Sequence, residues 1–121
     1  MLQTGTILMS PKKNPLNLNR LQLKTLALLQ ELATDPQHAA DEGDGGRRIL
    51  HLPQPHGDHF HVGAYVALSR DATGFTNQAV WLALERKGLA RADFPLAITL
   101  TPAGLAYETG VRAEILMGGG H

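Results

Sequence analysis

The chain has 121 residues, and its eleven Lys and Arg balance eleven Asp and Glu, so no global field draws it to nucleic acid. It contains no cysteine, which excludes disulfides and thiolate metal ligands, and no apolar run approaches the roughly 20 residues that a membrane span needs. We expect one soluble, cytoplasmic domain with a single modest core and without a signal peptide.

Residues 1–18 are expected to form a flexible N-terminal arm. Pro11 and Pro15 argue against a helix there. Lys12 and Lys13 are candidates for contact with phosphate, although a solvated leader is the more common role of a chain terminus.

A helix is predicted over residues 19–33. Asn19 and Gln22 have the spacing of a capping box, and Asp35-Pro36 ends the helix. Its leucines form a wide apolar stripe, which predicts burial against several elements or against a second subunit. The stripe consists of Leu21, Leu28 and Leu32, with Leu26 and Leu29 beside them.

Residues 36–46 have the composition of a mobile acidic loop, without the ligand pattern of a known calcium loop. Residues 47–52 read as a short strand, and residues 47–62 are expected to form a hairpin of their own. Residues 62–70 fit both an alternating strand and one face of a helix, and periodicity alone leaves the two open.

The clearest helix is predicted over residues 76–87. Thr76 is the expected N-cap, and Val80, Trp81 and Leu84 fall on one apolar face. Gly88 follows at the position that usually needs a positive φ.

A short hairpin follows, with residues 89–91 extended and Asp93-Phe94-Pro95 as its turn. Residues 96–100 alternate, which places Leu96, Ile98 and Leu100 on one face. Thr101-Pro102 begins a helix that is expected to reach about Glu108.

The segments Leu84-Glu-Arg-Lys-Gly-Leu-Ala90 and Leu100-Thr-Pro-Ala-Gly104, with the hairpin between them, resemble winged helix-turn-helix regulators of the MarR type. The resemblance implies an α+β, mainly α, fold in which residues 19–110 form the winged-helix domain and 111–121 a C-terminal tail. It also implies a helix over residues 63–70, preceded by an extra hairpin-like insertion.

By the same resemblance, the chain is expected to be a dimeric transcription regulator that binds double-stranded DNA. The start of the central helix would face the major groove, and nearby basic side chains would contact phosphates. The groove residues are Thr76, Asn77 and Gln78; the phosphate residues are Arg70, Arg86, Lys87 and Arg91.

Two departures from the family favour an alternative, a protein-interaction module without DNA contact. The wing tip, Asp93-Phe94-Pro95, lacks basic residues, and Leu82 stands where the family often has a polar residue. Phe94, Leu82 and the histidine-rich segment would then form the binding surface.

Four histidines and one aspartate lie within residues 51–61. On a strand, alternate side chains point the same way, which would bring His59 and His61 together. With His56 or Asp58 they are candidates for a divalent metal site, and a pH-sensitive cluster is the other possibility. The chain has neither a nucleophile elbow nor a phosphate loop, so we do not expect an enzyme.

Overall fold

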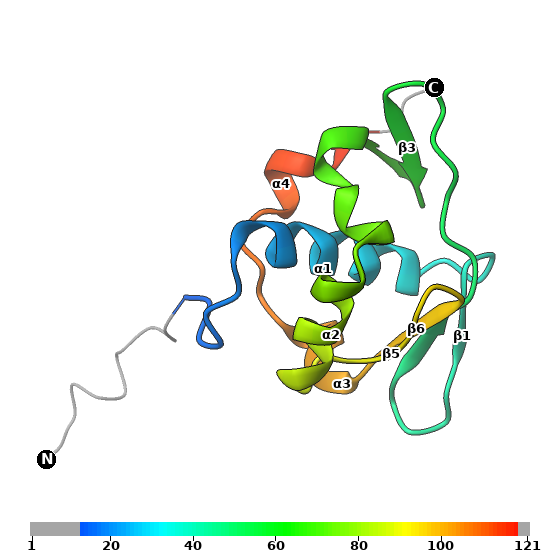
Figure 1. Cartoon of the computed structure of the whole chain (residues 1–121). Helices are drawn as coiled ribbons and strands as arrows, with labels where there is room; N and C mark the ends of the chain where they lie inside the picture. Colours follow the sequence, from blue (N-terminus) through cyan, green and yellow to red (C-terminus); the bar gives the residue numbers. More distant parts are fainter. Residues whose placement is uncertain (1–12, 119–121) are drawn as a thin grey trace, which may run out of the picture.

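The computed structural model describes residues 13–118 as an α+β fold with four α-helices and two small antiparallel sheets (Figure 1). The helices are α1 (Arg20–Ala33), α2 (Gln78–Arg86), α3 (Pro102–Ala106) and α4 (Arg112–Ile115). One sheet has the order β1 (Ala39–Asp41), β2 (Arg47–Ile49), β6 (Ala97–Leu100), β5 (Ala90–Asp93). The other has the order β3 (His59–Val62), β4 (Tyr65–Leu68), β7 (Met117–Gly118). The first twelve residues of the expected arm lie outside the described part.

Helix α1 is the centre of the fold, and α2, both sheets and the shorter helices pack around it (Figure 1). Its capping box forms as predicted, because Asn19 and Gln22 each bond the other's backbone N–H. Leu26, Leu28, Leu29 and Leu32 are fully buried. The wide leucine stripe is therefore covered within one chain, and it no longer argues for a second subunit.

The central helix and the hairpin after it are confirmed. Helix α2 ends before Gly88, whose φ is +77°, and β5 pairs antiparallel with β6. Ile98 and Leu100 are buried, but Leu96 belongs to the turn and is 72% exposed, so the prediction that it shares their face is wrong. A turn residue has no neighbouring sheet surface to pack on.

The hairpin expected within residues 47–62 does not form. Strand β2 pairs instead with β1, inside the predicted acidic loop, and with β6, where Ile49 lies opposite Ile98. This register buries both isoleucines, which no local pairing of residues 47–62 would achieve.

The helix predicted over residues 63–70 is also wrong. Tyr65–Leu68 is strand β4, which pairs with β3 across a tight turn where Gly63 has a φ of +60°. Two 3₁₀ helices, η2 (Ser69–Asp71) and η3 (Thr73–Thr76), then lead into α2. The segment that the sequence left open is a strand, because its backbone pairs with β3 from Tyr65 to Leu68 and with β7 at Tyr65 and Val66.

The predicted C-terminal tail contains α4 and β7, and Val111, Ile115 and Leu116 are buried. Arg112 of α4 forms an ion pair with the buried Glu31 of α1, and this hydrogen bond raises the pKa of the Arg112 guanidinium. The ordered fold therefore continues to Gly118. Among the described helices, none has the length and hydropathy that crossing a bilayer requires.

Helix α3 is shorter than expected and ends at Ala106. Thr101 caps it as predicted, accepting a hydrogen bond from the Gly104 N–H at 3.1 Å. A Cβ atom at Gly104 would overlap the Leu89 carbonyl oxygen and lie 2.9 Å from the carbonyl carbon. Only glycine allows this close approach of α3 to the start of β5.

Candidate functional site

The start of α2 differs from the expected DNA-reading surface. Asn77, not Thr76, is the N-cap, and its Oδ1 accepts hydrogen bonds from the N–H groups of Ala79 and Val80 at 3.0 and 3.4 Å. Thr76 is exposed as the last residue of η3, and Gln78 is exposed as the first residue of α2. The Asn77 amide oxygen is thus already engaged by the helix it caps.

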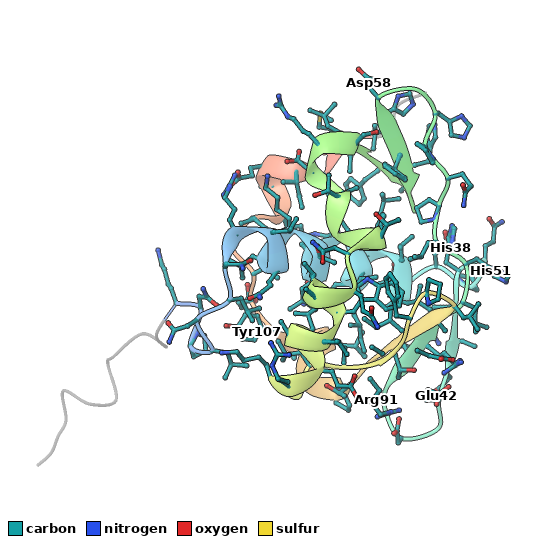
Figure 2. The ribbon with its side chains drawn as sticks, in the orientation of Figure 1. His38, Glu42, His51, Asp58, Arg91 and Tyr107 are labelled. Atoms are coloured by element: carbon teal, nitrogen blue, oxygen red, sulfur yellow. The ribbon has the colours of Figure 1, made fainter. Side chains whose placement is uncertain are left out.

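Two of the four basic residues expected to contact phosphates already have partners. Arg91 lies 3.5 Å from Asp44 and 3.8 Å from Glu42, in the loop between β1 and β2 (Figure 2). Lys87 donates to the Leu16 carbonyl oxygen at 2.6 Å. The wing carries a further acidic partner, because Arg48 lies 3.4 Å from Asp93.

The other two basic residues, Arg70 and Arg86, are exposed at opposite ends of the η2–α2 segment. Between them, the exposed face of α2 carries Leu82, 40% exposed, and Glu85. A face with an apolar and an acidic residue at its middle is poorly suited to a polyanion.

The structure brings the imidazoles of His56, His59 and His61 together, with ring centroids 5.0 to 6.1 Å apart. His59 and His61 share one side of β3, as the alternation predicted. The Asp58 carboxylate is 3.5 Å from His59 Nδ1 and is otherwise exposed. No group of three or more His, Cys, Asp or Glu side chains that could hold a metal ion occurs in residues 13–118. The metal site remains a hypothesis.

His51 lies apart from this histidine trio. Its carbonyl oxygen contacts Nδ1 of His38, a residue that the sequence reading did not single out (Figure 2). His38 in turn lies 4.0 Å from Asp35. This pair joins the end of α1 to the segment that follows β2.

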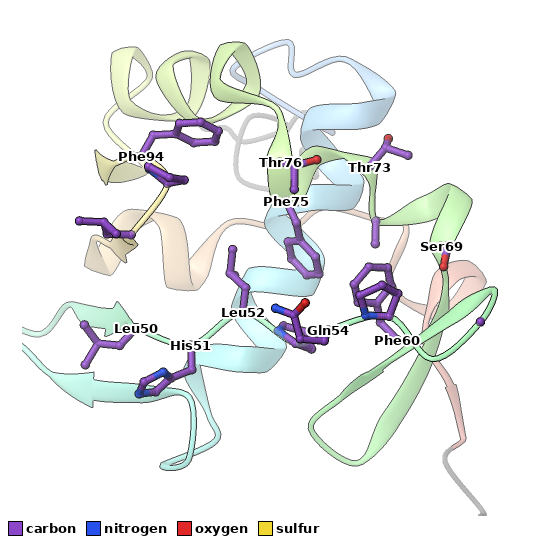
Figure 3. Close-up of a pocket in the computed structure, with 16 residues that line it drawn as sticks. Leu50, His51, Leu52, Gln54, Phe60, Ser69, Thr73, Phe75, Thr76 and Phe94 are labelled. Atoms are coloured by element: carbon purple, nitrogen blue, oxygen red, sulfur yellow. The ribbon is translucent and has the colours of Figure 1, made fainter.

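A cleft of about 820 Å³ lies between the two sheets (Figure 3). We call it the wing cleft. Its walls are residues 50–55, the η2–η3 segment and residues 94–96 of the turn between β5 and β6. Pro53 and Pro55 lack the N–H groups that a ladder needs, which keeps the first wall out of both sheets.

Three phenylalanines from different elements surround the wing cleft: Phe60 of β3, Phe75 of η3 and Phe94 of the wing tip (Figure 3). Phe60 and Phe75 meet edge to face at 5.7 Å between centroids. Phe94 is held by the buried Trp81, also edge to face, at 4.8 Å. Trp81 is anchored by its Nε1–H, which donates to the Gly74 carbonyl oxygen at 3.1 Å.

The polar side chains that line the wing cleft are His51, Gln54, Ser69, Thr73 and Thr76. None of its sixteen described lining residues is Asp, Glu, Lys or Arg. The Ser69 hydroxyl is buried and has no hydrogen-bond partner within the described chain. At its mouth, Leu50 is 42% and Leu96 is 72% exposed.

Among the lining residues, sequence reasoning singled out Phe94 and His51 for an interaction surface and Thr76 for DNA contact. The others come from segments up to 46 positions apart (50 to 96), and no local pattern links them. Exposed leucines beside prolines were the available signal. Comparison of the chain with protein-family models, with curated proteins and with solved structures gives no match.

Proposed function

We propose that the protein is a winged-helix-type binding module that recognises its partner through the wing cleft, and that α2 is not a DNA reader. The winged-helix part of the proposal is supported by the chain order. Helix α2 ends at Gly88, passes directly into the β5–β6 hairpin, and is followed by α3, with the leucine-rich α1 packed beneath.

The single observation that carries the binding surface is the concentration of exposed apolar area at the wing cleft. Leu96 and Leu50 are two of four large apolar side chains that stand out as exposed among the described residues, and both line this cleft. Exposed apolar surface beside a concave site is typical of binding surfaces.

DNA binding is less well supported. Arg91 and Arg48 are paired with carboxylates, and the wing tip ends in Asp93-Phe94-Pro95. Basic side chains that bind DNA phosphates gain binding free energy by releasing the counterions of the DNA. An arginine that is already paired with a carboxylate gains little in this way. The protein is also proposed to bind and not to catalyse, because Ser69, the hydroxyl enclosed at the cleft, has no base beside it.

The proposal is tested with two probes, the uncharged dye Nile red and mixed-sequence duplex DNA. Leu96→Asp places a charge at the mouth of the wing cleft, and Leu82→Asp places the same charge on an exposed leucine of α2 outside it. We expect Leu96→Asp to weaken dye binding by about tenfold or more, because a dye bound at the mouth would remove water from the carboxylate, and Leu82→Asp to leave dye binding unchanged.

DNA is the decisive comparison. Duplex binding that weakens steeply with salt, persists in Leu96→Asp and is lost in Arg70→Ala would overturn the proposal in favour of a DNA-binding regulator. Equal loss of dye binding in Leu96→Asp and Leu82→Asp would place the apolar surface elsewhere. Circular dichroism of each variant establishes that it is folded.

A further inference from the structure

We infer that the wing cleft takes an uncharged, largely apolar small molecule that carries one hydrogen-bonding group, and that Ser69 bonds this group. This inference rests on the proposed function, because it names the ligand class of the same cleft. Its evidence is separate: the charge of the lining, the size of the cavity, and one orphan hydroxyl.

The lining excludes charged ligands. Aspartate, glutamate, lysine and arginine are all missing from the residues that form the walls. A carboxylate or ammonium group that entered would lose part of its hydration and find no Asp, Glu, Lys or Arg to pair with, which is unfavourable. A neutral ligand meets no such penalty.

The size of the wing cleft suits a small molecule. Its volume of about 820 Å³ lies within the range of roughly 300–1,000 Å³ that small-molecule sites occupy. Phe60, Phe75 and Phe94 offer faces and edges of aromatic rings, against which a flat apolar molecule packs well. These walls favour an aromatic or cyclic ligand over a flexible chain.

An extended peptide fits the same walls less well. Every peptide residue except proline has one backbone N–H and one C=O. Both groups need hydrogen-bond partners when they are removed from water. Most of the lining is apolar side chain, from Leu50, Leu52 and the prolines to the phenylalanines. A ligand with a single polar group leaves fewer groups unpaired.

Among the polar residues that line the wing cleft, Ser69 is the one whose side-chain oxygen is buried without a hydrogen-bond partner in the described residues. Its Oγ is enclosed and lacks a partner among the described residues, a state that a hydroxyl rarely keeps in a folded protein. Ser69 nevertheless lines the wing cleft, at the start of η2. Rotation about its one side-chain torsion swings the hydroxyl between staggered positions, and a ligand oxygen in the cleft would complete its hydrogen bonding.

The test is displacement of Nile red by four compounds built on one ring system: naphthalene, naphthol, naphthoate and the aminomethylnaphthalene cation. We expect naphthol to displace the dye at concentrations at least tenfold lower than either charged compound. Ser69→Ala should weaken the binding of naphthol by about threefold to tenfold and leave the binding of naphthalene unchanged, because only naphthol loses a hydrogen bond.

The outcomes separate the inference from the proposed function. Suppose that Nile red binds to the wild type and not to Leu96→Asp, but naphthoate or the cation displaces it as well as naphthol does. The wing cleft is then the binding surface, and the proposed ligand class is wrong. If dye binding weakens as protein concentration rises, a second copy occupies the cleft and the inference fails. If a neutral proline-rich peptide competes better than naphthol, the occupant is a peptide. Absence of dye binding refutes the proposed function itself.

Discussion

Replacing Trp81 tests how the wing is held on the rest of the fold. The indole is fully buried, its Nε1–H donates to the Gly74 carbonyl oxygen, and its ring meets Phe94 of the wing tip. Trp81→Ala removes all three contributions and leaves a cavity, at about 3–5 kcal/mol. That is a large part of the roughly 5–15 kcal/mol that stabilises a typical domain.

Trp81→Phe separates the hydrogen bond from the cavity. Phenylalanine fills much of the same space but leaves the buried Gly74 carbonyl without its donor, which costs about 1–3 kcal/mol. We expect Trp81→Phe to lower the free energy of unfolding by about 2 kcal/mol and Trp81→Ala to lower it by about 4 kcal/mol. Phe94→Leu keeps Trp81 and removes the aromatic pair. It should lower the free energy of unfolding by about 0.5–1.5 kcal/mol more than the loss of buried apolar area alone predicts.

Urea denaturation followed by far-UV circular dichroism measures these differences, because Trp81 is the only tryptophan and its fluorescence is lost with it. Leu82→Ala, on the exposed side of the same helix, is the control and should stay within about 0.5 kcal/mol of wild type. A Trp81→Phe variant as stable as wild type would refute the Gly74 bond. A Trp81→Ala cost below about 1.5 kcal/mol would refute the packing of α2 against the wing.

Three further results are expected. Asn77→Ala should lose about 0.5–2 kcal/mol in thermal unfolding and Thr76→Ala much less, because Asn77 caps α2; the reverse order would restore Thr76 as the cap. Gly104→Ala should lose about 3 kcal/mol or more in urea unfolding, since its Cβ meets backbone that no side-chain rotation relieves, and a neutral effect would contradict that close approach. If the histidine trio is a metal site, Zn²⁺ raises the unfolding temperature of wild type and not of His59→Ala/His61→Ala; equal shifts in both proteins would remove the hypothesis.

The best predictions concern elements whose signals lie within a few residues of one another. The capping box of α1, the glycine after α2 and Thr101-Pro102 before α3 each act on the nearest backbone turn. Such signals do not depend on what the element packs against. The α+β class and the order α2–β5–β6–α3 were accessible for this reason.

The errors concern partners distant in the chain. Residues 65–68 alternate weakly, and whether they coil or extend depends on β3 on one side and β7, some fifty positions later, on the other. Strand β1 likewise exists because β2 pairs with it while β6 holds β2 on the other side. Sheet formation is decided by cross-strand partners, which a local pattern does not name.

The sequence by itself determined the capped start of α1, the glycine end of α2, the hairpin of β5 and β6, and a neutral chain without cysteine, because each follows from local backbone chemistry or composition. Only the tertiary structure decided that Arg91 faces Asp44, and that a cleft without Asp, Glu, Lys or Arg opens beside the turn between β5 and β6. Those properties arise from side chains that meet across dozens of residues, and proximity in space is set by the packed core, not by position along the chain.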